Sequence, residues 1–167
     1  SIEFDSKKYS IKTVMVDGKE IKYRAFENIV YVKNPVDTKY QVMNFYVPEE
    51  YYNGKSIGKY SAETAPIFMP NMVGGYMPAE PGTIGKSPFG NEVNAATVAL
   101  SKGYVVAQPG ARGRTIKDSN GKNRGKAPAG IVDLKAAVRY LHYNDKSMPG
   151  NAEKIISNGT SAGGAMS

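Results

Sequence analysis

Short apolar runs alternate with helical patterns through the second half of the sequence. The apolar runs cover residues 65–70, 104–108 and 155–158, and helical patterns at 91–102 and 130–144 separate them. Strands that are apolar throughout and are joined by helices form parallel sheets with both faces covered. The sequence therefore predicts an α/β fold in one domain, built on a mostly parallel sheet.

The beginning of the sequence has a different pattern, which is typical of antiparallel strands. Residues 11–16 and 20–32 are rich in β-branched and aromatic residues, and they flank Asp17-Gly18, a strong hairpin signal. Residues 41–47 form a third extended run, which Pro48 is expected to end. These runs predict antiparallel leading strands at one edge of the sheet.

Both helical patterns carry further detail. Gly103 follows the first pattern and is placed to end that helix. The segment from 109 to 125 is polar and rich in glycine, and it is expected to be a loop. In the second helical pattern, the apolar residues recur on one face: Ile131, Leu134, Ala137, Val138 and Leu141.

A candidate catalytic motif lies at the end of the sequence. Gly159-Thr160-Ser161-Ala162-Gly163 matches the Gly-x-Ser-x-Gly nucleophile elbow of α/β-hydrolases, and a predicted strand precedes it. A serine in this sharp strand-to-helix turn needs small neighbours, and the turn places its oxygen at a helix N-terminus. Ser161 is therefore the candidate nucleophile. The alternative is a loop rich in glycine and serine that matches the pattern by chance.

Acyl transfer also needs N–H groups that hold the oxyanion, and backbone amides supply them without reorganisation. The amide of Ala162, directly after the serine, is one candidate donor. The second candidate is Gly75, because Gly74-Gly75 follows the predicted strand 65–70, as the glycine-rich loops of lipases follow theirs. The alternative is a tight turn with glycines at positive φ.

The other members of a serine triad are not expected in this chain. Its one histidine, His142, precedes Ser161 within a predicted helix, whereas this fold orders its triad as serine, acid, histidine. Asp118, Asp133 and Asp145 also precede Ser161, so none is a good triad acid. His142 is expected to be an ordinary helical histidine, and Asp133 is expected to anchor the start of a helix near the elbow.

Composition excludes several other classes. The chain has no cysteine, so disulfides, thiolate catalysis and cysteine-based metal sites are absent. One histidine and dispersed carboxylates form no recognisable ligand set, so neither a metal nor another cofactor is expected. No apolar run is long enough to span a bilayer.

The net charge of +7 is also compatible with a protein that binds nucleic acid, which is the least favoured alternative. Such binding would weaken when salt is added. The tyrosines show no RNA-binding pattern and are expected to pack in the core and at the surface. The segment Gly110-Ala111-Arg112-Gly113-Arg114 lacks the ending of a phosphate-binding loop. Arg112 and Arg114 are expected to fix this loop beside the site, and contact with an acidic substrate is the alternative.

Several stretches, in matching order, resemble bacterial tannase and its tannase-like esterase relatives. The resemblance runs through nearly the whole chain and is carried by residues 23–32, 65–76, 111–114, 127–137 and 158–165. It implies an α/β-hydrolase that cleaves esters of phenolic acids, with gallate esters as the type substrate. It also implies Ser161 as the nucleophile and the amides of Gly75 and Ala162 as the oxyanion hole. The family's triad acid, histidine, lid and gallate-reading residues lie downstream of the part matched here.

Residues 1–167 are accordingly predicted to be the N-terminal portion of one α/β-hydrolase domain, ending just after the nucleophile elbow. Its last strand would be an uncovered edge. The expected partner is the C-terminal remainder of the same enzyme, as one polypeptide or a cleaved chain, and this portion alone is expected to be inactive. The alternatives are a general carboxylesterase, a dipeptidyl-peptidase-like enzyme or a non-catalytic binding protein of the same fold. Both the bacterial cytoplasm and export with removal of a signal fit the sequence.

Overall fold

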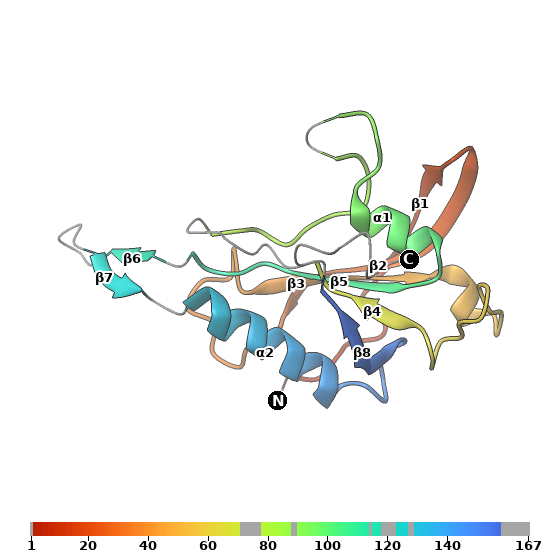
Figure 1. The fold of residues 1–167 in the computed structure, drawn as a ribbon. Helices are drawn as coiled ribbons and strands as arrows, with labels where there is room; N and C mark the ends of the chain where they lie inside the picture. Colours follow the sequence, from red (N-terminus) through yellow and green to blue (C-terminus); the bar gives the residue numbers. More distant parts are fainter. Residues whose placement is uncertain are drawn as a thin grey trace.

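The computed structural model describes residues 2–70, 78–87, 90–113, 115–117, 123–126 and 129–157. Within this part of the chain, one mixed sheet has the strand order β1-β2-β3-β5-β4-β8 (Figure 1). Its strands are β1 Ser10–Val16, β2 Lys19–Val30, β3 Val42–Pro48, β4 Pro66–Phe68, β5 Val105–Pro109 and β8 Asn151–Ile156. β1, β2 and β3 pair antiparallel, β3 pairs antiparallel with β5, and β5, β4 and β8 run parallel. The predicted fold class, α/β with antiparallel leading strands, is confirmed.

The hairpin at the start of the chain forms where the sequence predicted it. Asp17 and Gly18 both have positive φ, 51° and 76°, and Val16 pairs with Lys19 across the turn. Two residues at positive φ give a turn whose twist matches that of the flanking strands. β3 differs slightly from the prediction, because it includes Pro48 before the 3₁₀ helix η1 (Glu49–Tyr52) begins.

The two helices cover opposite faces of the sheet. α1 (Ala95–Ser101) connects β4 to β5, and α2 (Ala129–Tyr143) connects β5 to β8. β5 and β8 lie on opposite sides of β4, so the two connections run in opposite directions along the sheet. Parallel crossovers are right-handed almost without exception, and this rule places the two helices on opposite faces. Figure 1 shows this arrangement, with the sheet between α1 and α2.

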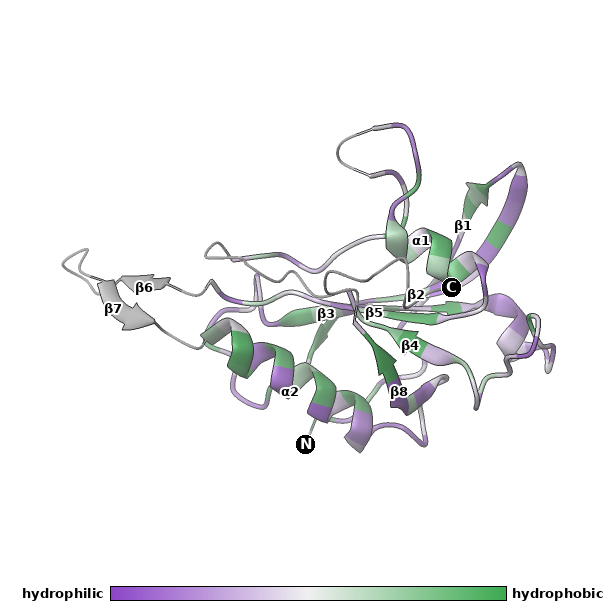
Figure 2. Ribbon diagram, in the orientation of Figure 1, coloured by the Kyte–Doolittle hydropathy of each residue, from purple (hydrophilic) through white to green (hydrophobic). Residues whose placement is uncertain are grey.

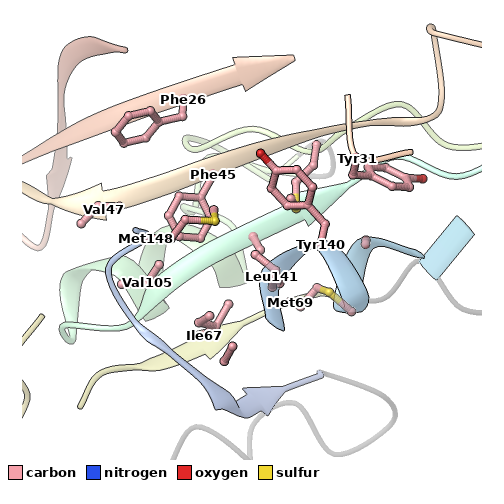
Figure 3. Close-up of a cluster of buried hydrophobic side chains, with 14 of the residues drawn as sticks. Phe26, Tyr31, Phe45, Val47, Ile67, Met69, Val105, Tyr140, Leu141 and Met148 are labelled. Carbon is pink, nitrogen blue, oxygen red and sulfur yellow. The ribbon is translucent and has the colours of Figure 1, made fainter. Parts of the chain in front are cut away.

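Each face of the sheet therefore has its own apolar core. Under α2, Phe45 and Val105 from the central strands are 0% exposed, and Tyr140 and Leu141 from the helix are 1% exposed (Figure 3). The α1 face is smaller and is built from Tyr23, Ala25, Tyr46, Phe68, Ala96, Ala99, Leu100, Tyr104 and Val106. Coverage of both faces leaves every residue of β3 and β5 buried.

The ends of α1 follow from single residues. The helix begins at Ala95 rather than near 91, because the side chain of Asn94 accepts a hydrogen bond from the amide of Thr97 at 2.9 Å. Asparagine is a favoured N-cap, since its oxygen satisfies a free amide of the first turn. Gly103 has a φ of 94°, so it ends the helix in the left-handed conformation that the sequence predicted.

Two predictions about the second half of the chain need correction. The segment expected to be a loop contains a small hairpin, β6 (Thr115–Lys117) with β7 (Asn123–Lys126). The buried face of α2 is also rotated from the predicted one. Ile131 remains 45% exposed, whereas Asp133, a charged residue, is 0% exposed. Apolar periodicity assigns a charged residue to the surface, and here a partner from elsewhere in the chain permits its burial.

Candidate active-site edge of the sheet

The candidate site residues follow two neighbouring parallel strands. β4 leads into the segment that holds Gly75, and β8 leads into the segment that holds Ser161 and Ala162. Phe68 pairs with Ile156 at the ends of these strands, and the next amide, that of Met69, donates to the carbonyl of Ile156 at 2.8 Å. Both segments therefore leave the sheet side by side, at its carboxyl edge. Gly75, Ser161 and Ala162 themselves lie outside the described residues.

A third segment at this edge, Gly110–Arg112 after β5, is held by its backbone on several sides. The amide of Gly110 donates to the carbonyl of Val42 at 2.8 Å, and its own carbonyl accepts from the hydroxyl of Tyr31 at 2.6 Å. Ala111 and Ala79 exchange two hydrogen bonds, of 2.8 and 2.9 Å. Ala79 belongs to the stretch of chain that returns from the Gly75 segment. The segments after β4 and β5 are thus joined directly.

The carboxylate of Asp133 is the buried centre of this edge. It accepts from the amide of Arg112 at 2.8 Å and from Nε and Nη2 of the same residue at 3.0 and 2.8 Å. Gln41 adds a fourth hydrogen bond, from Nε2 at 2.9 Å, and its own Oε1 accepts from the amides of Val36 and Asp37. A buried charge is tolerated where a partner charge and hydrogen bonds surround it. The network ties α2, the segment after β5 and the segment before β3 together.

The ionisation states at this edge follow from these contacts. The hydrogen bond from Arg112 to Asp133 raises the pKa of the Arg112 guanidinium above its usual value. Burial raises the pKa of the Tyr31 hydroxyl, and the nearby charge of Asp133 raises it further. Arg112 is therefore charged and Tyr31 neutral near pH 7, and the Tyr31 hydroxyl keeps the hydrogen that it donates to Gly110.

One sequence prediction is confirmed by this network, because Arg112 does fix the loop after β5. Asp133 anchors the N-terminal half of α2 to this loop, from a position after the first turn of the helix. Arg114 lies outside the described residues. Tyr31 and Gln41 were missed, because each belongs to a segment remote in sequence and no local pattern marks it as a partner of this edge.

His142 and Asp145 lie at the opposite edge of the sheet. Nε2 of His142 is 2.8 Å from the carbonyl of Ala152, and the carboxylate of Asp145 accepts from the amide of Ala152 at 2.9 Å. Ala152 stands at the start of β8, whereas the Ser161 segment follows its end at Ile156, about 13 Å further on at the usual strand rise. Both residues attach α2 to β8, as expected of a structural histidine. Asp118 lies outside the described residues.

Two negative findings apply to the described part of the chain. No group of three or more histidine and carboxylate side chains there could hold a metal ion. No helix in the same residues is long and apolar enough to cross a membrane.

Comparison with known proteins gives consistent matches. A family model described as BD-FAE matches residues 85–167, and no curated protein matches the chain in sequence. A tannase of Fusobacterium nucleatum is 61% identical with a TM-score of 0.87, over 99% of this chain and 34% of its own. A tannase from Lactobacillus plantarum is 45% identical with a TM-score of 0.81, over 99% of this chain and 35% of its own. A tannin acyl hydrolase in complex with ethyl gallate is 45% identical with a TM-score of 0.79, over 99% and 36%.

This chain thus spans about a third of the length of each of these tannases. Within that third, the backbone fold and the sequence are similar along almost the whole chain. The resemblance to bacterial tannases that the sequence indicated is confirmed. The chain is therefore related, over nearly its whole length, to the bacterial tannases, which are esterases of the α/β-hydrolase type.

Proposed function

We propose that the complete protein is a serine carboxylic ester hydrolase that cleaves gallate-type esters of phenolic acids. The observation that supports it most directly is the pairing of β4 with β8. This pairing puts the carboxyl ends of β4 and β8 side by side, and in the sequence these two strands precede Gly75 and Ser161, as expected for an oxyanion loop and a nucleophile elbow. The substrate class rests on the relatives, since two solved structures of tannin acyl hydrolase are complexes with ethyl gallate and with 3,4-dihydroxybenzoate.

The proposed reaction proceeds through an acyl-enzyme. The hydroxyl of Ser161 attacks the ester carbonyl while a histidine from outside this chain accepts its proton. The amides of Gly75 and Ala162 hold the oxyanion, and the leaving alcohol takes the proton back. Water, activated by the same histidine, then attacks the acyl-enzyme and releases the phenolic acid. No metal or organic cofactor takes part in this proposal.

Turnover by the complete protein tests the proposal. Methyl gallate should be hydrolysed, with a higher kcat/KM than phenyl acetate or a dipeptide anilide. A preference for the acetate would indicate a general carboxylesterase, and a preference for the peptide would indicate a peptidase. Failure on all substrates, with no labelling by a fluorophosphonate, would leave a non-catalytic binding protein.

We further propose that residues 1–167 are the N-terminal portion of one domain and that the remainder of the same protein covers the outer side of α2. A shallow groove of about 560 Å³ lies there, and β8 has no second neighbour among the described strands. Figure 2 shows apolar residues along this helix beside polar ones. The groove is lined by Met69, Ile131, Leu134, Lys135, Val138, Arg139 and His142. The length of the tannase relatives leaves ample chain to cover it.

A polar side chain placed in this groove tests the covering. Ile131→Asn in the complete protein should lower the free energy of unfolding by about 2 kcal/mol or more, because a covered groove would bury the new amide without enough hydrogen-bond partners. Ile11→Asn is the matched control, since Ile11 is 49% exposed, close to the 45% of Ile131, but lies on β1 at the far edge of the sheet. Urea denaturation measures both. Equal, small losses of unfolding free energy in the two variants would show that the remainder of the protein does not cover the groove.

A further inference from the structure

The chain between β4 and α1 is fastened at both ends of its Gly75 segment. At one end, the amide of Met69 donates to Ile156. At the other, Ala79 and Ala111 exchange their two hydrogen bonds. These two fastenings are the described anchor points on either side of Gly75. The hydrogen bond between Met69 and Ile156 continues the pairing of β4 with β8. The Ala79–Ala111 pair, by contrast, depends on how the segment after β5 is held in place.

The chain around the Ala79–Ala111 pair is closely packed. A Cβ on the adjacent Gly110 would lie 2.8 Å from the carbonyl oxygen of Ala79, and closer still to that of Tyr40. On the other side, a Cβ on Gly130 would lie 2.8 Å from the carbonyl oxygen of Arg112. The backbone segments approach so closely at these two places that only glycine fits, and this close packing opposes a movement of Arg112.

Arg112 in turn is fixed by Asp133. Three of the four hydrogen bonds to this carboxylate come from Arg112, including the one from its backbone amide. The carboxylate is 0% exposed and belongs to α2, which is packed on the sheet through Ala137, Tyr140 and Leu141. A continuous series of contacts therefore runs from the core under α2 through Asp133, Arg112 and Ala111 to Ala79.

We propose that Asp133 is a positioning residue for ester hydrolysis, which it serves by holding the Arg112–Ala111–Ala79 connection in place. This inference rests on the proposed function. An oxyanion donor must lie within about 2.7 to 3.1 Å of the developing charge. A displacement of about 1 Å far from the reacting atoms can cost about 100-fold in rate. The transition state depends on this donor more strongly than the bound substrate does. We therefore expect a larger change in kcat than in KM.

Asp133→Asn in the complete protein is the first test. The amide side chain keeps the shape of Asp133 but loses its charge and presents an N–H group toward the donors of Arg112 or Gln41. We expect kcat for methyl gallate to fall about 10- to 100-fold with KM within about 3-fold. The affinity for a boronic acid that mimics the tetrahedral intermediate should fall by the same factor as kcat/KM, and inhibition by gallate should stay unchanged.

The ion pair between Arg24 and Glu49 provides the matched control. Like the pair of Arg112 and Asp133, this ion pair is bidentate, with Nε and Nη2 of Arg24 at 3.0 and 3.1 Å from the carboxylate of Glu49. Both side chains are largely buried. Glu49 follows the carboxyl end of β3, which is antiparallel to β5, so this pair lies at the opposite edge of the sheet. Glu49→Gln should lower stability while leaving kcat and the boronic acid affinity unchanged.

The outcomes separate the inference from the proposed function. If the unmodified protein hydrolyses methyl gallate and Asp133→Asn keeps its kcat, or loses kcat only as much as Glu49→Gln does, the positioning role is wrong and the esterase stands. If the unmodified protein hydrolyses no ester, both fail. Should Asp133→Asn not fold, Arg112→Lys replaces it, because lysine keeps the charge and the backbone bond to Asp133. That variant should lose several-fold in kcat with KM retained, and unchanged kcat would overturn the inference.

Discussion

Ser161→Ala in the complete protein is expected to lower kcat for methyl gallate by about 10⁴- to 10⁶-fold, the range found when a catalytic serine is removed from other hydrolases. The physical reason is that, in the proposed mechanism, Ser161 alone forms the acyl-enzyme, so only binding and oxyanion stabilisation would remain to accelerate attack by water. Binding of gallate should be retained, since the hydroxyl of Ser161 contributes little to the ground state. Steady-state kinetics and competitive inhibition by gallate measure the two effects separately.

Ser147→Ala is the control for this variant. The Ser147 hydroxyl donates to the carbonyl of Asn144 in the turn after α2, at the edge of the sheet opposite the Ser161 segment. Its removal should leave kcat unchanged. A fluorophosphonate should label the unmodified protein and Ser147→Ala, but not Ser161→Ala. Ester hydrolysis that survives in Ser161→Ala would show that the Gly-x-Ser-x-Gly match is accidental and that another residue is the nucleophile.

The second large effect concerns stability. Phe45→Ala is expected to lower the free energy of unfolding by about 3 to 5 kcal/mol, because it removes a buried ring and leaves a cavity that the strands cannot close. Phe45 is 0% exposed in β3, and its ring centroid lies 6.3 Å from that of Phe26 and 6.0 Å from that of Phe4. Figure 3 shows Phe45 within the cluster under α2, between Phe26 and Val105.

Tyr143→Ala is the control for the core variant. Tyr143 is an aromatic residue of similar size, it stands at the end of α2, and it is 62% exposed. Its replacement should change the free energy of unfolding by about 0.5 kcal/mol or less. Urea denaturation of the complete protein, with the slope against urea unchanged, measures both variants. A loss at Phe45 no larger than that at Tyr143 would mean that β3 is not at the centre of the core.

Local sequence signals predicted most of the regular structure correctly. Asp17-Gly18 determines the first turn through its positive φ angles, and Gly103 ends α1 for the same reason. The start of α1 was placed too early, since the cap at Asn94 was not recognised among several polar residues. The hairpin of β6 and β7 was missed because its polar, glycine-rich sequence has no apolar alternation to mark it as strands.

The candidate site was only partly predictable. The motif around Ser161 and the pair Gly74-Gly75 indicated ester hydrolysis by a serine. The strand order adds that β4 and β8, which precede these two motifs, are neighbours in the sheet. The partners of Asp133 could not be found from local patterns. Gln41 is 92 positions away from it in the sequence, and only the antiparallel course of β3 beside β5 brings the two together.

The sequence by itself determined the order of the helices and of the six strands of the main sheet, the first turn and the resemblance to the tannases, because these depend on residues close together in the chain. Only the tertiary structure decided which strands are neighbours, which face of α2 is buried and where the charge of Asp133 is compensated. The physical reason is that a buried charge is stable only beside its partners. Those partners reach Asp133 through the crossover connections of the sheet, which no local pattern encodes.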